Sequence, residues 1–159
     1  MLPSRYTNIL WWTGYFFVAL TMQRHFPGVD ALVPGLMISC EENRGQQTFW
    51  LFLITLLIQE GTGSLAFGNA ILWYGALFLY FSVGRLFFVT GSLFFVVLIA
   101  AALGLTHALL LYMMSSLQGF QIDAYRLTEQ ATAQAFLIPP LYAALSLLRK
   151  RFCAYENGI

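Results

Sequence analysis

The charged residues of this chain are few, and they lie between long uncharged runs. The 159 residues include eight basic and seven acidic side chains, 9% of the chain, whereas 59% are hydrophobic. A water-soluble domain has about 25% charged residues. The chain is therefore predicted to be an integral membrane protein whose charges mark the ends of its spans. The runs without Asp, Glu, Lys or Arg are residues 6–23, 45–59, 61–84, 86–122 and 130–148.

Composition also limits the kind of partner. No Pro-, Gly- or Ser-rich linker divides the chain, so residues 1–159 are predicted to form a single transmembrane domain. The net charge of +1 gives no basic face for nucleic acid. The only basic cluster, Arg149-Lys150-Arg151, follows an apolar run and is predicted to be a cytoplasmic anchor. The expected partners are the lipid bilayer and other membrane proteins.

The apolar runs are continuous, which favours helices over the alternating pattern of a membrane β-barrel. A helix needs about 20 apolar residues to cross roughly 30 Å of hydrocarbon. The second and third helices are short, at about 10 and 14 residues, and would reach only about 15–21 Å. The predicted fold is an all-α six-helix transmembrane bundle, with helices at residues 6–24, 31–40, 47–60, 65–83, 86–116 and 128–151.

Six crossings would place both termini on one side of the membrane. Six of the eight cations then share that side, and only Arg24 and Arg126 lie on the other. The positive-inside rule assigns the richer side to the cytoplasm. The predicted location is a bacterial inner membrane, multi-pass, with both termini cytoplasmic. The six cations are Arg5, Arg44, Arg85, Arg149, Lys150 and Arg151.

Glu60 is the sharpest candidate for a functional residue. An ionisable side chain inside a membrane costs roughly 2.5–3.5 kcal/mol on insertion scales. Glu60 ends the third predicted helix, and Gly61-Thr62-Gly63-Ser64 follows it. We consider Glu60, Gly61 and Gly63 candidates for partner or ligand binding. The alternative is structural, a carboxylate that holds a sharp turn through backbone N–H groups.

The two histidines are weaker candidates for a functional site than Glu60. His25 and His107 are both predicted near the outer interface, where they could ligate haem if the first and fifth helices adjoin. Interfacial or hydrogen-bonded histidines are the favoured interpretation, and no further ligands accompany them for zinc. We expect no cofactor and no metal.

Two further patterns concern helix shape and packing. Pro139-Pro140 removes two backbone donors and is predicted to kink the last helix near its middle. Small residues four positions apart, such as Gly104 with Ala108 and Ala131 with Ala135, allow helices to approach closely in lipid.

The segment from Glu60 to Gly68, EGTGSLAFG, resembles the central signature of the rod shape-determining protein MreD family. In that family an acidic residue ends a helix, a glycine turn follows, and a second glycine stands eight positions on. Pro139-Pro140 and the basic end of the last helix also match. The family usually has Asp where Glu60 stands, and an inner glycine is shifted to Gly63. The resemblance implies a fold similar to the substrate-binding subunits of energy-coupling-factor transporters, and it makes Gly68 a candidate site residue.

If the resemblance holds, it implies a non-enzymatic scaffold subunit of the cell-wall elongation machinery, which determines cell shape through peptidoglycan synthesis. Such a subunit would bind a single-span MreC-like partner. Two alternatives remain open from the sequence. One is a small subunit of another multisubunit membrane complex, including an electron-transfer complex, and the other is a solute-binding component of a membrane transporter.

Overall fold

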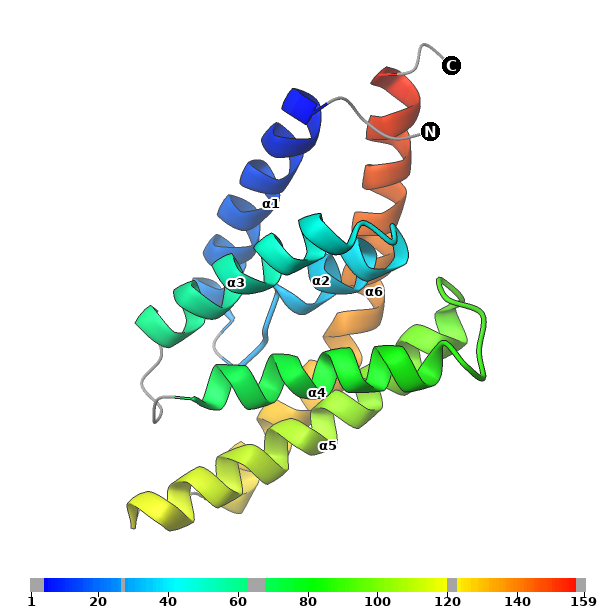
Figure 1. Cartoon of the computed structure of the whole chain (residues 1–159). Helices are drawn as coiled ribbons and strands as arrows, with labels where there is room; N and C mark the ends of the chain where they lie inside the picture. The colour runs from blue at the N-terminus through cyan, green and yellow to red at the C-terminus, as the bar shows by residue number, and fades with distance from the viewer. Residues whose placement is uncertain (1–4, 27, 63–67, 120–122, 157–159) are drawn as a thin grey trace.

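The computed structural model describes residues 5–26, 28–62, 68–119 and 123–156, and these residues form six α-helices and no strand (Figure 1). The predicted all-α class and helix number are confirmed for this part of the chain. The helices are α1 (Arg5–His25), α2 (Val33–Glu41), α3 (Gly45–Thr62), α4 (Asn69–Gly84), α5 (Leu93–Gln118) and α6 (Ala124–Glu156).

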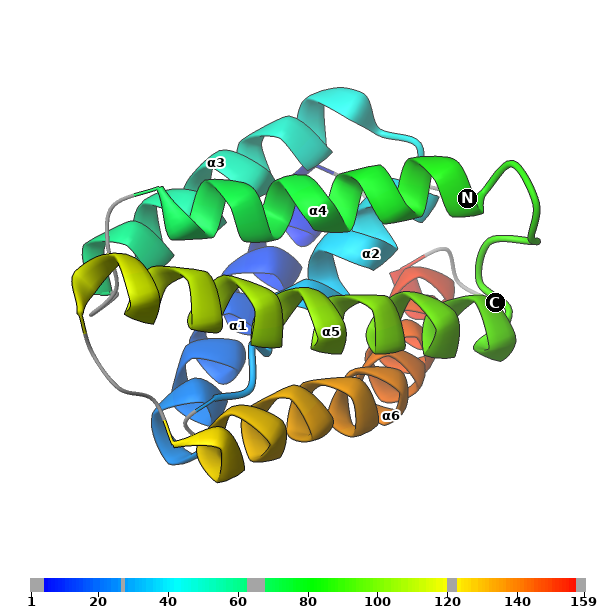
Figure 2. The same ribbon diagram turned by 90° about the horizontal axis from the view of Figure 1, so that it is seen from below.

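The short helix α2 forms the centre of the molecule. It has nine residues, and residues 33–39 are all buried. It packs against α3, α4 and α6, and Tyr15 of α1 donates a hydrogen bond to the carbonyl of Ala31 just before it. A helix that is buried all round belongs to a core. The predicted short second helix is confirmed, and it lies within the bundle rather than on its surface (Figure 2).

The third, fifth and sixth helices differ at their ends from the sequence prediction, and α6 is longer at both ends than the predicted range 128–151. The third helix is 18 residues long rather than about 14, because it begins directly after Arg44 and continues past Glu60 to Thr62. The fifth helix does not begin at Leu86 but at Leu93. Ser92 caps it by accepting a hydrogen bond from Phe95 N at 3.2 Å, which satisfies one of the free amides of the first turn.

Helices α5 and α6 lie side by side along much of their length (Figure 2). A Cβ atom placed on Gly104 of α5 would lie 2.8 Å from the carbonyl oxygen of Ala131 and 3.2 Å from Cβ of Ala135, both in α6. The small residues therefore permit the close approach that their spacing indicated. Pro139 and Pro140 lie inside α6, and the axis of this helix changes direction in its middle part (Figure 1).

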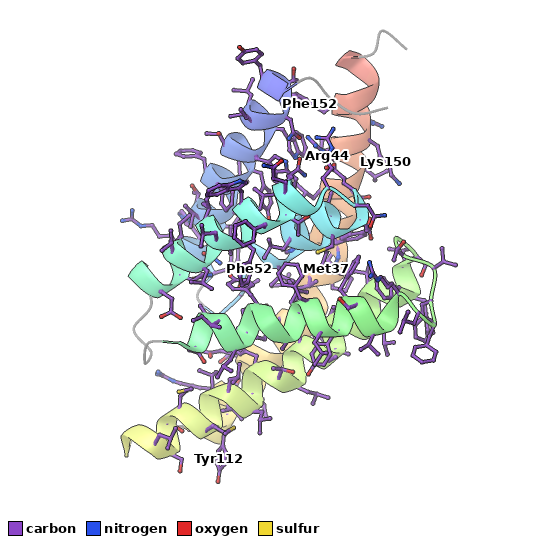
Figure 3. All side chains as sticks on the ribbon, in the orientation of Figure 1. Met37, Arg44, Phe52, Tyr112, Lys150 and Phe152 are labelled. Atoms are coloured by element: carbon purple, nitrogen blue, oxygen red, sulfur yellow. The ribbon has the colours of Figure 1, made fainter. Side chains whose placement is uncertain are left out.

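The start of α1 and the end of α6 lie at the same end of the molecule (Figure 1). The rings of Trp11 and Phe152 pack with centroids 5.1 Å apart. Arg44 and Lys150 also lie toward this end, whereas Tyr112 lies at the opposite end (Figure 3). We call these the terminal end and the distal end.

Two helical stretches in the described residues are long and apolar enough to cross a membrane by length and composition. They are Leu93–Leu117 and Tyr125–Phe152, in α5 and α6. Helix α4 is apolar but shorter.

Candidate ligand-binding site

A cavity of about 920 Å³ lies at the distal end of the bundle. Its walls come from the last turns of α1 and α3, the connection before α2, the start of α4, the second half of α5 and the first half of α6. A pocket of this size is within the range of small-molecule sites. Apolar side chains such as Leu20, Ile58 and Leu110 form part of the wall. The polar lining residues include Gln23, Arg24, Asp30, Glu60, Asn69, His107, Arg126, Gln130 and Gln134.

Asp30 is a buried carboxylate at the base of this site, with 7% of its surface exposed. Its Oδ1 accepts hydrogen bonds from Gln23 Nε2 at 2.7 Å and from Leu32 N at 2.9 Å. Its Oδ2 accepts from Trp73 Nε1 at 2.9 Å and from Tyr74 OH at 2.5 Å. One side chain thereby joins α1, the start of α2, and α4.

Two effects act in opposite directions on the pKa of Asp30. Burial disfavours the charged carboxylate and raises the pKa above its ordinary value. The donors from Tyr74, Leu32 and Trp73 favour the charged form and oppose this rise. Burial is the larger effect, so the pKa is raised.

Glu60 lies at the rim of the cavity, where α3 is followed by α4. Its Oε1 accepts hydrogen bonds from Gly68 N and Ala70 N at 3.1 Å, and its Oε2 also lies 3.1 Å from Gly68 N. These amides belong to the first turn of α4, which has no other side-chain cap. Gly68 has a φ of +97°, a conformation that L-residues with a side chain rarely adopt.

The structure thus brings Glu60 and Gly68 together, two of the four residues that we singled out as partner or ligand contacts. Gly61 is exposed at the end of α3 and is not among the residues that line the cavity. Gly63 lies outside the described residues.

His107 and His25 occupy different environments. His107 is half-buried in the cavity wall, with its ring edge-on to Trp73 and the centroids 5.3 Å apart. His25 is exposed, its Nδ1 lies 2.8 Å from the carbonyl of Thr21, and it does not line the cavity. Within the described residues, no group of three or more His, Cys, Asp or Glu side chains is placed to hold a metal ion.

Three buried polar atoms in the cavity wall have no hydrogen-bond partner in the described part of the chain. They are Asn69 Oδ1 of α4, His107 Nε2 of α5 and Gln134 Oε1 of α6. Gln134 is only 1% exposed. Buried polar atoms are rarely left without a partner, so this clustering is unusual for a purely structural region.

A second polar cluster lies at the terminal end, around Arg149 of α6. Arg149 is 3% exposed, and its Nε lies 2.8 Å from Glu42 Oε1 in an ion pair. Its Nη2 donates to Asn8 Oδ1, and its Cζ lies 5.5 Å and 5.3 Å from the ring centres of Trp11 and Trp12. Two atoms of this cluster, Arg149 Nη1 and Trp12 Nε1, are also buried without a hydrogen-bond partner in the described residues, but neither residue lines the cavity.

Arg149 therefore does not have the exposed position that we predicted for the cytoplasmic anchor, because its guanidinium group pairs with Glu42 inside the bundle. Lys150 and Arg151 are exposed.

The sequence did not single out Asp30, Asn69 or Gln134. The donors to Asp30 from Trp73 and Tyr74 are 43 and 44 residues away in the chain, so the spacing gave no signal. The only local hint is that Asp30 stands between the apolar residues Val29 and Ala31.

No family model matches the chain, and no curated protein or solved structure matches it.

Proposed function

We propose that this chain is a membrane-embedded binding protein that holds a small molecule in the distal cavity, without converting it chemically. The observation that carries the proposal is the cavity itself, about 920 Å³ in volume and lined by polar side chains from separate helices. Ligand sites commonly lie between the helices of a bundle, with apolar walls and a few polar groups that fix orientation. Binding of this kind suits the solute-binding component of a transporter.

The exposed surface supports a membrane setting. Many large apolar side chains are more than half exposed, including Phe17, Leu105 and Phe136 at 74–79%. Monomeric soluble proteins rarely expose large contiguous apolar patches. We further propose that the chain crosses a bacterial inner membrane six times with both termini in the cytoplasm. Arg24 and Arg126 line the distal cavity, and Arg44 and Lys150 lie toward the terminal end.

Native mass spectrometry of the full chain, purified in a mild detergent, tests this proposal. We expect a retained small molecule of defined mass, and we expect Leu111→Trp, which puts bulk into the cavity wall, to lose it. Leu147→Trp on the exposed face of α6 is the matched control and should retain it. If the wild type retains nothing and no added small molecule changes its thermal stability, the proposal fails.

A scaffold function resembling that of MreD is the second candidate. The observation that favours it is the contact between Glu60 and Gly68, the two positions that carry the resemblance. The contact between Glu60 and Gly68 joins the end of α3 to the start of α4, and these two helix ends would bind an MreC-like partner.

Co-purification in mild detergent with identification of the retained proteins tests the scaffold. Recovery of a single-span MreC-like protein supports it, and recovery without any cell-wall elongation protein counts against it. Glu60→Gln distinguishes a role of this carboxylate in partner binding from a purely structural role at the start of α4. Unchanged partner recovery and cell shape would leave Glu60 with only the structural role at the start of α4.

A further inference from the structure

The unpartnered polar atoms of the cavity are mainly hydrogen-bond acceptors. In the described residues five buried side-chain polar atoms have no partner, and three of them line this one cavity. Asn69 Oδ1 and Gln134 Oε1 accept hydrogen bonds, and His107 Nε2 accepts or donates according to its tautomer. Such acceptors need donors from water or from a ligand, because an unsatisfied buried group costs about 1–3 kcal/mol.

The two acidic residues of the cavity already accept hydrogen bonds from groups of the protein. Each carboxylate oxygen of Asp30 already accepts two hydrogen bonds, from Gln23 and Leu32 on one side and from Trp73 and Tyr74 on the other. Glu60 is engaged by the backbone N–H groups at the start of α4, where the helix dipole is positive.

The two basic residues of the cavity have no such partner. In the described part of the chain the one ion pair joins Arg149 to Glu42 at the terminal end. Arg24 and Arg126, from α1 and α6, are exposed and line the cavity. The guanidinium groups are therefore the charged groups of the site that remain free to pair with a ligand, since the carboxylates already accept hydrogen bonds from the protein.

We propose that the cavity takes an organic anion that carries its own hydrogen-bond donors, and this inference rests on the proposed function. A carboxylate or phosphate group of the ligand pairs with Arg24 and Arg126, whose planar guanidinium groups suit such anions. Amide, amine, hydroxyl or ring N–H groups at its other end donate to Asn69, Gln134 and His107. The same chemistry is present in a water-soluble metabolite and in the head group of an anionic lipid.

Thermal unfolding of the full chain in a neutral detergent provides the test. A bacterial small-molecule extract is separated by ion exchange into anionic, neutral and cationic fractions, and an anionic phospholipid fraction is prepared from the same cells. We expect an anionic fraction to raise the midpoint by several degrees, as saturating ligands do. A shift with the aqueous anions identifies a metabolite, and a shift with the phospholipids alone identifies a head group.

The fractions separate failure of this inference from failure of the proposed function. A shift produced only by the neutral or the cationic fraction would overturn the organic-anion class and leave a binding function in place. No shift with any fraction would overturn both, and would mean that water alone satisfies the acceptors.

Variants assign the two ends of the site. The double variant Arg24→Gln, Arg126→Gln should need at least about ten times more of the anionic fraction to reach half of the maximal rise in the unfolding midpoint. The control Lys150→Gln, at the terminal end, should respond as the wild type does. Gln134→Met removes the acceptor at similar volume and should also weaken the response by about tenfold. Its unfolding midpoint without ligand reports separately on folding. If these variants respond like the wild type, the assignment of residues is wrong.

Discussion

Two buried charged side chains, Asp30 and Arg149, join helices that are far apart in the sequence. Asp30 connects α1, α2 and α4 at the distal end, and Arg149 of α6 contacts Asn8 of α1 and Glu42 after α2 at the terminal end. Breaking a buried polar contact leaves the remaining partner without compensation. We expect stability to depend strongly on both residues.

Asp30→Asn should lower stability by about 2 kcal/mol or more. The amide group of asparagine presents N–H groups where the carboxylate now accepts, so two of the four donors lose their acceptor. Thermal unfolding in detergent measures the loss. The control is Asp123→Asn, at an exposed aspartate that accepts one hydrogen bond from Tyr125 N, and it should change the midpoint little. Equal effects of the two substitutions would contradict the central role of Asp30.

Arg149→Ala should cost about 3 kcal/mol, because it leaves the Glu42 carboxylate without its ion-pair partner inside the bundle. For a chain of this size that loss corresponds to a decrease in the midpoint of roughly 6–12 °C. The neighbouring substitutions Lys150→Ala and Arg151→Ala are matched controls at exposed positions and should stay within about 0.5 kcal/mol. If all three behave alike, Arg149 acts as a surface cation.

At the scale of elements, the sequence predicted helices better than it predicted their ends. Continuous apolar runs gave six helices, but helix ends depend on individual capping groups. The run after Arg85 is apolar through Leu86 and Phe87, yet α5 begins only at Leu93, where Ser92 caps it. Helix α3 extends two residues beyond each end of the predicted range 47–60, and α6 likewise extends beyond 128–151 to Ala124 and Glu156.

The contact between α5 and α6 depends on the absence of a side chain at Gly104. Gly104→Ala places a Cβ atom 2.8 Å from the carbonyl oxygen of Ala131, so the helices must separate at a cost of about 1–3 kcal/mol. Gly75→Ala in α4 is the matched control, because no atom lies within 4 Å of the new Cβ. It should stabilise the protein by up to about 1 kcal/mol through helix propensity. We expect Gly104→Ala to lower the unfolding midpoint and Gly75→Ala to raise it. If both substitutions lowered the midpoint, a specific α5–α6 contact at Gly104 would be contradicted.

At the scale of the whole molecule, the bundle has two polar ends that differ in kind. The terminal end contains a polar cluster in which Arg149 forms an ion pair with Glu42 and donates a hydrogen bond to Asn8. The distal end contains an open cavity whose acceptors and arginines lack protein partners in the described residues. A ligand site therefore fits the distal end, where the cavity lies.

The proposed orientation predicts opposite accessibility for the two ends. In a chain whose Cys40 and Cys153 are replaced by Ser, Arg126→Cys should react with a membrane-impermeant maleimide in spheroplasts. Lys150→Cys should react only in inverted membrane vesicles, because the cation-rich side faces the cytoplasm. Mass spectrometry of the labelled chain gives the readout. Labelling of both positions from one side would refute an orientation in which α6 crosses the membrane.

By itself the sequence determined the helical class, and it predicted a membrane setting with Arg24 and Arg126 on the side away from the other cations. These properties follow from local composition and the lengths of apolar runs, which need no knowledge of contacts. Only the tertiary structure showed that Asp30 accepts hydrogen bonds from α1, the start of α2 and α4, and that Arg149 is buried. It also showed that Asn69, His107 and Gln134 line one cavity. These residues come from segments that are distant in the chain, and packing alone decides which polar atoms meet and which are left for a ligand.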